Sequence, residues 1–464
     1  MPEAIAAIIG AGPAGFYATE QLLAAGFAVD LYDVLPTPFG LVRAGVAPDH
    51  PKIKSVTRVY ERAASRPGFR FFGGVELGSD ITREELLERY NAVLYAVGTS
   101  SDNRLGVLGE DRPGSVPATE FVAWYNGHPD YADHEFDLGC PRAVVIGNGN
   151  VAIDVARMLV LDPDELELTD AADHAITHFR DSGVRDVVLL GRRGPAQAAF
   201  TNPELRELGE LSRADVLVDP AELELDEHSA AWLASDDAPA TAKRNLEILR
   251  GYAASKPTGN SHRIQLRFLR SPLELVGDDE TGPVTGLRVA VNRLAPDGRG
   301  GLRAIATDAH ELIECGLVVR SIGYRGRPLP GVPFDDRRGV IRNEGGRVIG
   351  EDGAPLAGEY AVGWIKRGPS GVIGTNKKDA VETVAHVLAD AAAGALNQPP
   401  SQVDPEAIES WLATRVVGLV TWEGWSAIDA HEQRSGKPHG RPRVKIVRVP
   451  EMVAIAEAGV PARP

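Results

Sequence analysis

The chain has 464 residues, of which 43% are hydrophobic and 25% charged, and this composition predicts two or three soluble globular domains. Its formal net charge of −16 at pH 7 argues against general nucleic-acid binding. No apolar run reaches the length of about 18 residues that a membrane span needs, so we expect no membrane segment.

The first residues indicate where in the cell the protein is expected, and the cysteines exclude several kinds of site. The chain begins Met1-Pro2-Glu3 and enters an apolar run without a basic or transit-like leader, so we expect a cytoplasmic protein. Cys140 and Cys315 lie far apart in the sequence and form no C-x-x-C pair. We therefore expect no internal iron–sulfur cluster, disulfide framework, catalytic dithiol or metal site.

A glycine turn follows the first apolar run, residues 5–9. Gly10, Gly12 and Gly15 are spaced G-x-G-x-x-G and are followed by a helical segment. The first glycine permits a tight strand-to-helix turn, the second lets the backbone approach a pyrophosphate, and the third lets helix and strand pack closely. The next predicted strand ends at Asp33, about 20 residues on, where an acid binds a ribose 2′-hydroxyl. This combination predicts a dinucleotide site.

A long loop with two Pro-rich turns, residues 36–54, follows this unit, and such a loop is more often functional than idle. Beyond it, helical and apolar segments alternate. We expect helices at 55–64 and 82–90 and strands at 69–72 and 92–98. This alternation predicts a parallel sheet.

A second glycine turn, residues 147–152, reads G-x-G-x-x-A after the apolar run 143–146. Ala152 can replace the third glycine because its methyl group still allows close packing. The next strand ends in Arg192 and Arg193 instead of an acid, and two guanidinium groups fit a 2′-phosphate, which favours NADP over NAD. The alternative is a pair of solvated arginines.

The distance between the second glycine turn and its arginines departs from the usual pattern. The gap is about twice the usual separation of about 20 residues. We attribute the excess to an acidic insertion of helix and loop at 161–181. Further on, residues 202–211 predict a helix capped by Asn202. The presence of the acids Glu204 and Glu207 near the start of this helix is explained by their favourable interaction with the helix dipole alone.

The C-terminal third contains antiparallel strands, a glycine-rich loop and a basic stretch. Residues 264–319 predict several antiparallel strands with a hairpin at 296–298. The loop at 363–374 precedes a helix at about 377–389, whose positive end suits an electron-rich ring that gains negative charge on reduction. The basic stretch 437–445 is either a solvated tail or part of a docking face for an acidic partner.

The chain contains two predicted dinucleotide-binding folds, one with an acid for a ribose and one with arginines for a 2′-phosphate. Together they suggest FAD plus NADPH. The blocks at 35–51, 147–152, 191–194 and 363–369 resemble the adrenodoxin-reductase family of NADPH–ferredoxin reductases, most strongly its mycobacterial branch. The resemblance covers nearly the whole chain in order. It implies an α/β fold with two Rossmann-like dinucleotide-binding domains of the three-layer ββα, glutathione-reductase-like type. The NADPH domain, 105–322, would be inserted into an FAD domain made of 1–104 and 323–464.

The resemblance also implies the site residues, position by position. Beside Gly10 and Gly15 of the first turn, the implied FAD contacts are Gly12, Ala14, Asp33, Leu41, Leu77, Trp364, Gly371, Val372 and Ile373. The implied NADPH contacts are Asn148, Gly149, Asn150, Val151, Arg192, Arg193, Glu204 and Gly371. The remaining two, His50 and Glu207, match positions near the junction of nicotinamide and flavin, where they would handle protons or position the nicotinamide.

The implied activity is that of a flavoenzyme that passes a hydride from NADPH to FAD and then single electrons to a ferredoxin. Because the chain has no cluster of its own, this acidic iron–sulfur protein would be a separate partner of a monomeric reductase. Lys52, Lys54 and Arg58, with the stretch 437–445, predict a basic docking face. The rivals are an NADPH-dependent flavin monooxygenase, a quinone or dye reductase and a non-catalytic nucleotide-binding module.

Overall fold

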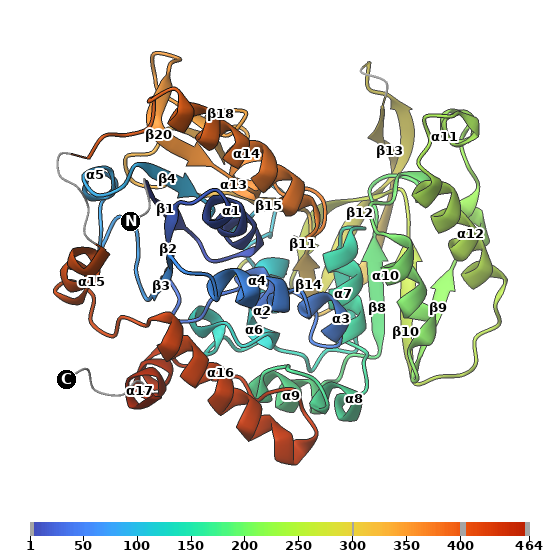
Figure 1. Ribbon diagram of the computed structural model, residues 1–464. Helices are drawn as coiled ribbons and strands as arrows, with labels where there is room; N and C mark the ends of the chain where they lie inside the picture. Colours follow the sequence, from blue (N-terminus) through green and yellow to red (C-terminus); the bar gives the residue numbers. More distant parts are fainter. Residues whose placement is uncertain (1–3, 299–300, 400–404, 460–464) are drawn as a thin grey trace. The chain divides into compact units, whose positions relative to one another are not determined.

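The computed structural model describes residues 4–298, 301–399 and 405–459, which fall into two compact units (Figure 1). The first unit comprises Met1–Ser101, Asn126–Ala132 and Gly323–Pro464, and the second comprises Asp102–Tyr125 and Asp133–Ile322. The second unit is thus an insertion into the first along the chain. Residues 126–132, which the sequence places inside the inserted range, group with the first unit.

The first unit is built on a seven-stranded sheet in the order β18-β19-β20-β4-β1-β2-β3. The strands from β20 to β3 are parallel, and β18 and β19 add an antiparallel edge. All five residues of β1 are buried, so both faces of the sheet must be covered. The strands are β1 (Ile5–Ile9), β2 (Ala28–Asp33), β3 (Phe69–Gly73), β4 (Ala92–Tyr95), β18 (Asn343–Glu344), β19 (Arg347–Ile349) and β20 (Pro355–Ala361).

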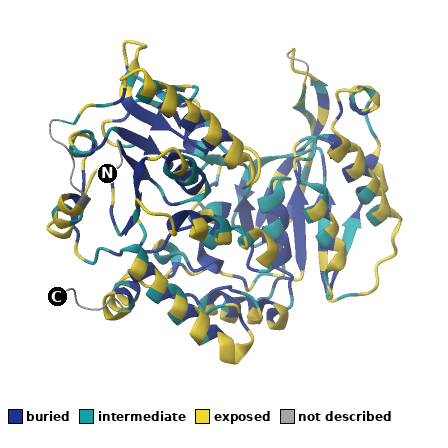
Figure 2. Cartoon of the chain, viewed as in Figure 1, coloured by how far each residue is buried: buried dark blue, intermediate teal, exposed yellow. Residues whose placement is uncertain are grey.

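Two hydrophobic clusters cover the two faces of this sheet. One contains Phe16, Leu31 and Val384 and joins the sheet to α1 and α14, which pack against each other (Figure 1). The other contains Ile9 and Tyr95. Figure 2 shows the central strands as the buried layer. The sheet therefore places the C-terminal edges of β1 and β2 beside the start of α1, where open α/β sheets bind ligands.

The helices of the first unit form where they were predicted and differ at their ends: the one expected at 82–90 spans only Arg83–Leu87. The helix expected at 55–64 begins at Thr57, and the one expected from 377 runs from Thr375 to Ala392. They are α1 (Pro13–Ala24), α2 (Leu41–Ala44), α3 (Pro51–Lys54), α4 (Thr57–Ala64), α5 (Arg83–Leu87), α13 (Trp364–Arg367), α14 (Thr375–Ala392), α15 (Pro405–Ala413), α16 (Trp422–Gly436) and α17 (Val449–Gly459), with η1 (Pro129–Tyr131) and η5 (Lys437–His439). Two short strand pairs complete the secondary structure: β5 (Ser101–Asp102) with β15 (Tyr324–Arg325), and β16 (Phe334–Asp335) with β17 (Val340–Ile341).

The second unit stacks two sheets. A parallel sheet runs β6-β14-β7-β8-β10-β9, and an antiparallel sheet runs β11-β12-β13. One hydrophobic cluster includes residues of both sheets, among them Val144, Val188, Leu287 and Ile313, so the sheets pack face to face. The strands are β6 (Ser115–Pro117), β7 (Arg142–Ile146), β8 (Asp186–Leu190), β9 (Ala214–Val218), β10 (His262–Arg267), β11 (Arg270–Val276), β12 (Gly286–Pro296), β13 (Leu302–Glu314) and β14 (Leu317–Arg320).

Helices of the second unit pack against the parallel sheet, which completes the ββα layering and confirms the predicted fold class. They are α6 (Ala118–Tyr125), α7 (Asn150–Met158), α8 (Pro163–Glu167), α9 (Asp173–Arg180), α10 (Asn202–Glu207), α11 (Glu227–Ala234) and α12 (Ala240–Ala254), with η2 (Pro195–Gln197), η3 (Leu208–Glu210) and η4 (Pro220–Leu223). In the described part of the chain, no helix has the length and apolar character that crossing a membrane would require.

The structure confirms some of the segments predicted for this unit and corrects others. Helices α8 and α9 occupy the predicted insertion at 161–181, and the hairpin forms as expected, with Asp297 and Gly301 bonded across its tip. Residues 264–319 do not form only antiparallel strands, because β10 and β14 belong to the parallel sheet. Alternating burial in β10 resembles that of an antiparallel strand, so its pattern alone was misleading.

The fold brings Cys140 and Cys315 close together, although they lie far apart in the sequence. A Cβ atom on Gly316 would lie 2.5 Å from Cys140 Cβ, and Cys315 directly precedes this glycine. Burial raises the pKa of both thiols, that of Cys315 to about 12 with Cys140 contributing. The two free thiols therefore stay protonated at neutral pH, as structural rather than catalytic thiols do.

Candidate functional site

The first glycine turn has the geometry of a phosphate cradle. Gly10 has φ +111°, and a Cβ atom there would lie 2.6 Å from the Ala96 carbonyl oxygen. A Cβ on Gly15 would lie 2.1 Å from the Gly10 oxygen, so helix and strand touch here. Beside Gly12, by contrast, no atom lies within 4 Å of such a Cβ. This opening lies at the start of α1, whose Gly12 cap supplies no side-chain partner for the first N–H groups.

Gly12→Ala is expected to leave the apo-protein folded and to weaken FAD binding. Gly12 has φ −84° and ψ −174°, which alanine adopts without strain, so stability should change by no more than about 0.5 kcal/mol. A methyl group in a close contact costs about 1–3 kcal/mol, so the Kd of FAD should rise about 10- to 100-fold. FAD titration and thermal unfolding measure the two effects.

The contrasting variant is Gly15→Ala, whose methyl group would meet the Gly10 carbonyl. It should lower stability even without FAD. An equal loss of stability in Gly12→Ala and Gly15→Ala would contradict the distinction between an open and a packed glycine.

Asp33 ends β2 beside the same turn and keeps room for a ribose. One carboxylate oxygen accepts the Ala11 N–H at 2.7 Å and the other accepts the Leu35 N–H at 3.0 Å. Burial raises the pKa of this carboxyl group to about 6, against the lowering effect of these N–H groups. A carboxylate has about four acceptor positions, so capacity remains for a ribose hydroxyl.

We expect FAD binding to the apo-protein to weaken as the pH falls through about 6, the pKa of Asp33. Only the deprotonated carboxylate accepts a charge-assisted hydrogen bond, which is about twice as strong as a neutral one. The Kd should therefore rise about fivefold between pH values of about 8 and about 5. Fluorescence titration checks the profile. In Asp33→Asn the step at about 6 should vanish, and its persistence there would assign it to another group.

The loop after β2 folds back onto the glycine turn. Phe39 donates its N–H to the Ala11 carbonyl at 2.8 Å, and a Cβ on Gly40 would lie 3.0 Å from Gly12 Cα. The following Leu41 is 44% exposed, so a predicted FAD contact lies at the opening. Leu77, another predicted contact, is buried in the hydrophobic cluster of the opposite face of the sheet.

The loop around Trp364 lies against the start of α1. A Cβ on Gly363 would lie 2.6 Å from Ala14 Cβ, and the Gly363 N–H donates to the Asp379 carboxylate. The Trp364 ring lies 5.9 Å from that of Tyr324, and its buried Nε1 has no partner among the described residues. Two predicted FAD contacts, Ala14 and Trp364, thus come from distant segments to one place, with an unused donor beside them.

The glycine-rich loop is fixed to the beginning of α14. Arg367 donates to Ser370, Thr375 and Asn376, while Lys366 binds Asp379 at 3.0 Å. The predicted contacts Gly371, Val372 and Ile373 lie in this loop, and Val372 is 53% exposed.

The predicted site residue His50 is buried just before α3, with Nε2 3.9 Å from an Asp49 carboxylate oxygen.

The second glycine turn repeats the geometry of the first. A Cβ on Gly147 would lie 2.0 Å from the Ser321 oxygen, whereas beside Gly149 no atom lies within 4 Å of one. Ala152 is fully buried, as its packing role requires. The predicted contacts Asn148, Asn150 and Val151 surround this opening, and Asn150 Oδ1 accepts the Thr201 N–H at 2.8 Å. This last bond ties the turn to α10.

Arg192 and Arg193 form a turn of unbalanced positive charge. Arg192 is exposed and Arg193 is half-buried. No carboxylate of the described residues forms an ion pair with either one. Burial lowers the pKa of Arg193, and the neighbouring Arg192 lowers it further. Two adjacent cations are chemically suited to an anion such as a phosphate, and a phosphate at this position stays a prediction.

Helix α10 presents the two predicted acids, but its cap differs from the expectation. Thr201 occupies the N-cap position without a side-chain capping bond, and Asn202 is the first helical residue, whose side chain donates to Asn245 Oδ1 at 2.7 Å. Glu204 has a buried carboxylate oxygen without a partner among the described residues. Glu207 pairs with the buried Arg157 at 3.5 Å, a contact that the sequence did not indicate.

The basic stretch 437–445 is not a solvated tail, because two of its cations make buried or half-buried contacts. Arg443 binds Asp429 at 2.6 Å and Glu432 at 3.0 Å, and Lys445 is buried. Lys445 donates to the carbonyl groups of Arg43 and Asn126 at 3.0 Å each. Arg443 turns inward because the acids that bind it, Asp429 and Glu432, lie on α16, which precedes the stretch.

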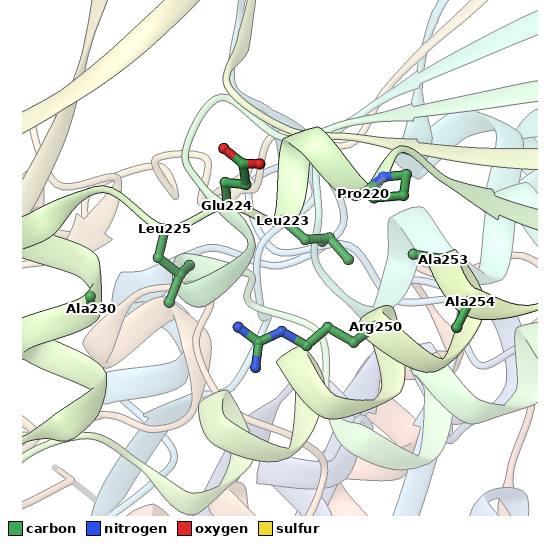
Figure 3. Close-up of a pocket in the computed structure, with 8 residues that line it drawn as sticks. All are labelled: Pro220, Leu223, Glu224, Leu225, Ala230, Arg250, Ala253 and Ala254. Atoms are coloured by element: carbon green, nitrogen blue, oxygen red, sulfur yellow. The ribbon is translucent and has the colours of Figure 1, made fainter.

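A shallow cavity of about 600 Å³ lies apart from the predicted residues, beside η4 and α12 (Figure 3). Its lining is mostly apolar, with one exposed acid and one exposed base. The lining residues are Pro220, Leu223, Glu224, Leu225, Ala230, Arg250, Ala253 and Ala254. It contains none of the predicted contacts, so it does not bear on the nucleotide sites.

Comparison with known proteins gives a consistent set of relatives. Over 462 residues, the chain is 49% identical to NADPH-ferredoxin reductase FprA of Mycobacterium tuberculosis, covering 97% of this chain and 98% of that protein. It is 41% identical to the mitochondrial NADPH:adrenodoxin oxidoreductase of Salvelinus fontinalis, covering 97% and 91%. The solved structure of M. tuberculosis FprA in complex with NADPH matches with a TM-score of 0.90 and 48% identity, covering 98% and 99%. No protein-family model matches the chain.

Proposed function

The chain belongs to the adrenodoxin-reductase family of NADPH–ferredoxin reductases, and from that premise we propose that it oxidises NADPH and reduces a ferredoxin through bound FAD. One observation carries the proposal. The chain has two open glycine cradles, one beside a carboxylate that suits a ribose and one beside two guanidinium groups that pair with no carboxylate among the described residues and suit a 2′-phosphate. A single-nucleotide dehydrogenase needs only one of them.

We propose that the FAD domain consists of 1–104 and 323–464. Bound FAD accepts two electrons from NADPH and can release them singly. The open cradle at Gly12 and the N-terminus of α1 would bind the pyrophosphate, and Asp33 the ribose. Contacts along the rest of the cofactor would come from Ala14, Leu41, Leu77, Trp364, Gly371, Val372 and Ile373.

The NADPH domain would be 105–322. Its pyrophosphate would lie at the second cradle, and its 2′-phosphate at Arg192 and Arg193. The pyrophosphate contacts would be Asn148, Gly149, Asn150 and Val151, with Glu204 and Gly371 further along the nucleotide. We propose that Glu207, oriented by Arg157, and His50 position the nicotinamide or move a proton.

For the electron acceptor we propose a separate, acidic ferredoxin and a monomeric reductase. Lys52 and Arg58 are exposed, and Lys54 is half-buried with Nζ 3.5 Å from Asn126 Oδ1. Lys52 and Lys54 belong to α3 and Arg58 to α4, close along the chain to His50 and the loop at Leu41. Because Arg443 and Lys445 serve structural contacts, we restrict the proposed docking face to this first cluster.

Anaerobic stopped-flow absorbance tests the function. The purified protein should be yellow, NADPH should bleach it faster or at lower concentration than NADH, and an added ferredoxin should re-oxidise it at a rate that falls steeply with salt. Protein without flavin, or flavin that NADPH does not bleach, would refute the proposal. Oxygen consumption coupled one-to-one to a hydroxylated product would favour the monooxygenase instead.

A further inference from the structure

The turn that carries Arg192 and Arg193 is held by its neighbours through backbone hydrogen bonds. Gly191 donates to the Arg267 carbonyl at 2.8 Å and accepts the Arg270 N–H at 3.0 Å. The Leu269 N–H then donates to the Arg193 carbonyl at 3.1 Å. The segment between β10 and β11 therefore follows the arginine turn residue by residue.

Leu269 takes a backbone conformation that a branched side chain rarely adopts. Its φ is 55°, in the left-handed region. In this conformation its N–H meets the Arg193 carbonyl and its own carbonyl accepts the Asn292 N–H at 2.8 Å. A non-glycine residue keeps such a conformation only where the surrounding structure fixes it, and here it links the arginine turn to β12.

Asn292 supports the same turn with its side chain. It is 4% exposed, and its Nδ2 donates to the Arg192 carbonyl at 2.8 Å and to Ser271 Oγ at 2.7 Å. The pairing of β12 with β13 shifts register between Ala290 and Asn292. A bulge of this kind re-aims the following side chain, which explains how a strand residue reaches the turn.

The backbone support matters because little else holds the two guanidinium groups. Within the described chain neither forms an ion pair, and the one hydrogen bond of Arg193 is a long one, 3.5 Å, to the Gln197 carbonyl. Two like charges side by side repel each other. A long side chain binds a phosphate more tightly when its origin is fixed before binding, because less freedom is lost.

We propose that Asn292 is a positioning residue that sets the preference of the second unit for a 2′-phosphorylated adenosine. The inference rests on the proposed function, which places NADPH at this turn. Asn292 makes no contact with the nucleotide in this account. It fixes the carbonyl group of Arg192 and, through Leu269, that of Arg193, so that both guanidinium groups start from one geometry.

Calorimetric titration of the holoenzyme with adenosine 2′,5′-bisphosphate and with 5′-AMP tests the proposal. Asn292→Ala should weaken the bisphosphate about 3- to 10-fold, as the loss of one buried hydrogen bond does, and leave 5′-AMP unchanged. In turnover, the KM for NADPH should rise with kcat and the NADH constants unchanged. The matched control is Thr307→Val, which removes the 2.8 Å bond to the Val291 carbonyl at the same bulge without touching the turn.

The outcomes distinguish a failure of the role proposed for Asn292 from a failure of the proposed NADPH site. If Asn292→Ala weakens both ligands equally, or neither, Asn292 has only a structural role and the inference is overturned. If the unaltered protein binds both ligands equally, the assignment of NADPH to this turn fails, and the inference fails with it. If Asn292→Ala does not fold, Asn292→Leu, which keeps the size of the buried side chain, should show the same selective loss.

Discussion

Replacing Arg192 and Arg193 together by alanine is expected to lower kcat/KM for NADPH by about 100- to 1,000-fold and to leave that for NADH nearly unchanged. Each charge-assisted hydrogen bond to a phosphate contributes about 1.5–3 kcal/mol, and no acid in the part of the chain that the structure describes pairs with either guanidinium group. The bleaching rate of the flavin under each nucleotide, measured anaerobically, gives both constants.

The matched control for this pair is Arg244→Ala. Arg244 is an exposed arginine on α12 of the same unit, where it pairs with Glu247 at 3.2 Å. Its removal should leave the ratio of NADPH to NADH activity unchanged. A double variant that retains the ratio of the unaltered protein would show that the 2′-phosphate is bound elsewhere.

The second large effect is expected from Glu432→Gln, which should lower the free energy of unfolding by about 3–5 kcal/mol. Glu432 is fully buried and accepts hydrogen bonds from Arg43 at 2.5 and 2.8 Å and from Arg443 at 3.0 Å. The Ile446 N–H adds a fourth bond at 2.9 Å. Glutamine keeps the shape of the side chain but removes the carboxylate charge that binds Arg43 and leaves Arg443 with Asp429 as its remaining acidic partner among the described residues.

The loss should depend on pH in a defined direction. The two arginines hold the pKa of Glu432 below its usual value, although burial alone would raise it. A depressed pKa stabilises the fold above the pKa of the unfolded chain, about 4.3, and this stabilisation disappears as the pH falls. The difference between Glu432→Gln and the unaltered protein should therefore narrow at acidic pH.

Denaturant unfolding at several pH values measures this difference, and Glu457→Gln is the control. Glu457 is an exposed acid on the neighbouring helix α17. We also expect Glu432→Gln to release FAD more readily, because Arg43 belongs to α2, next to Leu41 at the opening of the first cradle. A stability loss below about 1 kcal/mol would place Glu432 among the weak ion pairs of protein surfaces.

What the sequence could predict was chiefly local. The roles of Gly10, Gly12 and Gly15 follow from their spacing, and the structure gives each the expected environment, packed for the first and third and open for the second. The paired turn at 147–152 and its distant arginines were found for the same reason. The assignment of single residues to FAD or NADPH contacts stays a prediction.

The failures share one cause, which is a partner distant in the sequence. The inward turn of Arg443 depends on Glu432, and the side chain of Asn202, which was expected to cap α10, contacts Asn245 on α12. Asn292 gave no sequence signal at all, since its contact with the arginine turn depends on a bulge. Spacing rules describe residues that are close along the chain and do not predict contacts between residues that are distant in the sequence.

The interrupted first unit also determines an order of events during synthesis. Strand β4 pairs with β20, and the residues that pair are separated by roughly 260 positions, or about 15–50 s of translation at about 5–20 residues per second. During that interval the inserted unit can emerge and fold, while β4 remains unpaired along the edge that later pairs with β20. Until β20 is made, β4 is an edge strand whose unpaired backbone groups can pair with another chain, which is the feature of a strand that favours aggregation.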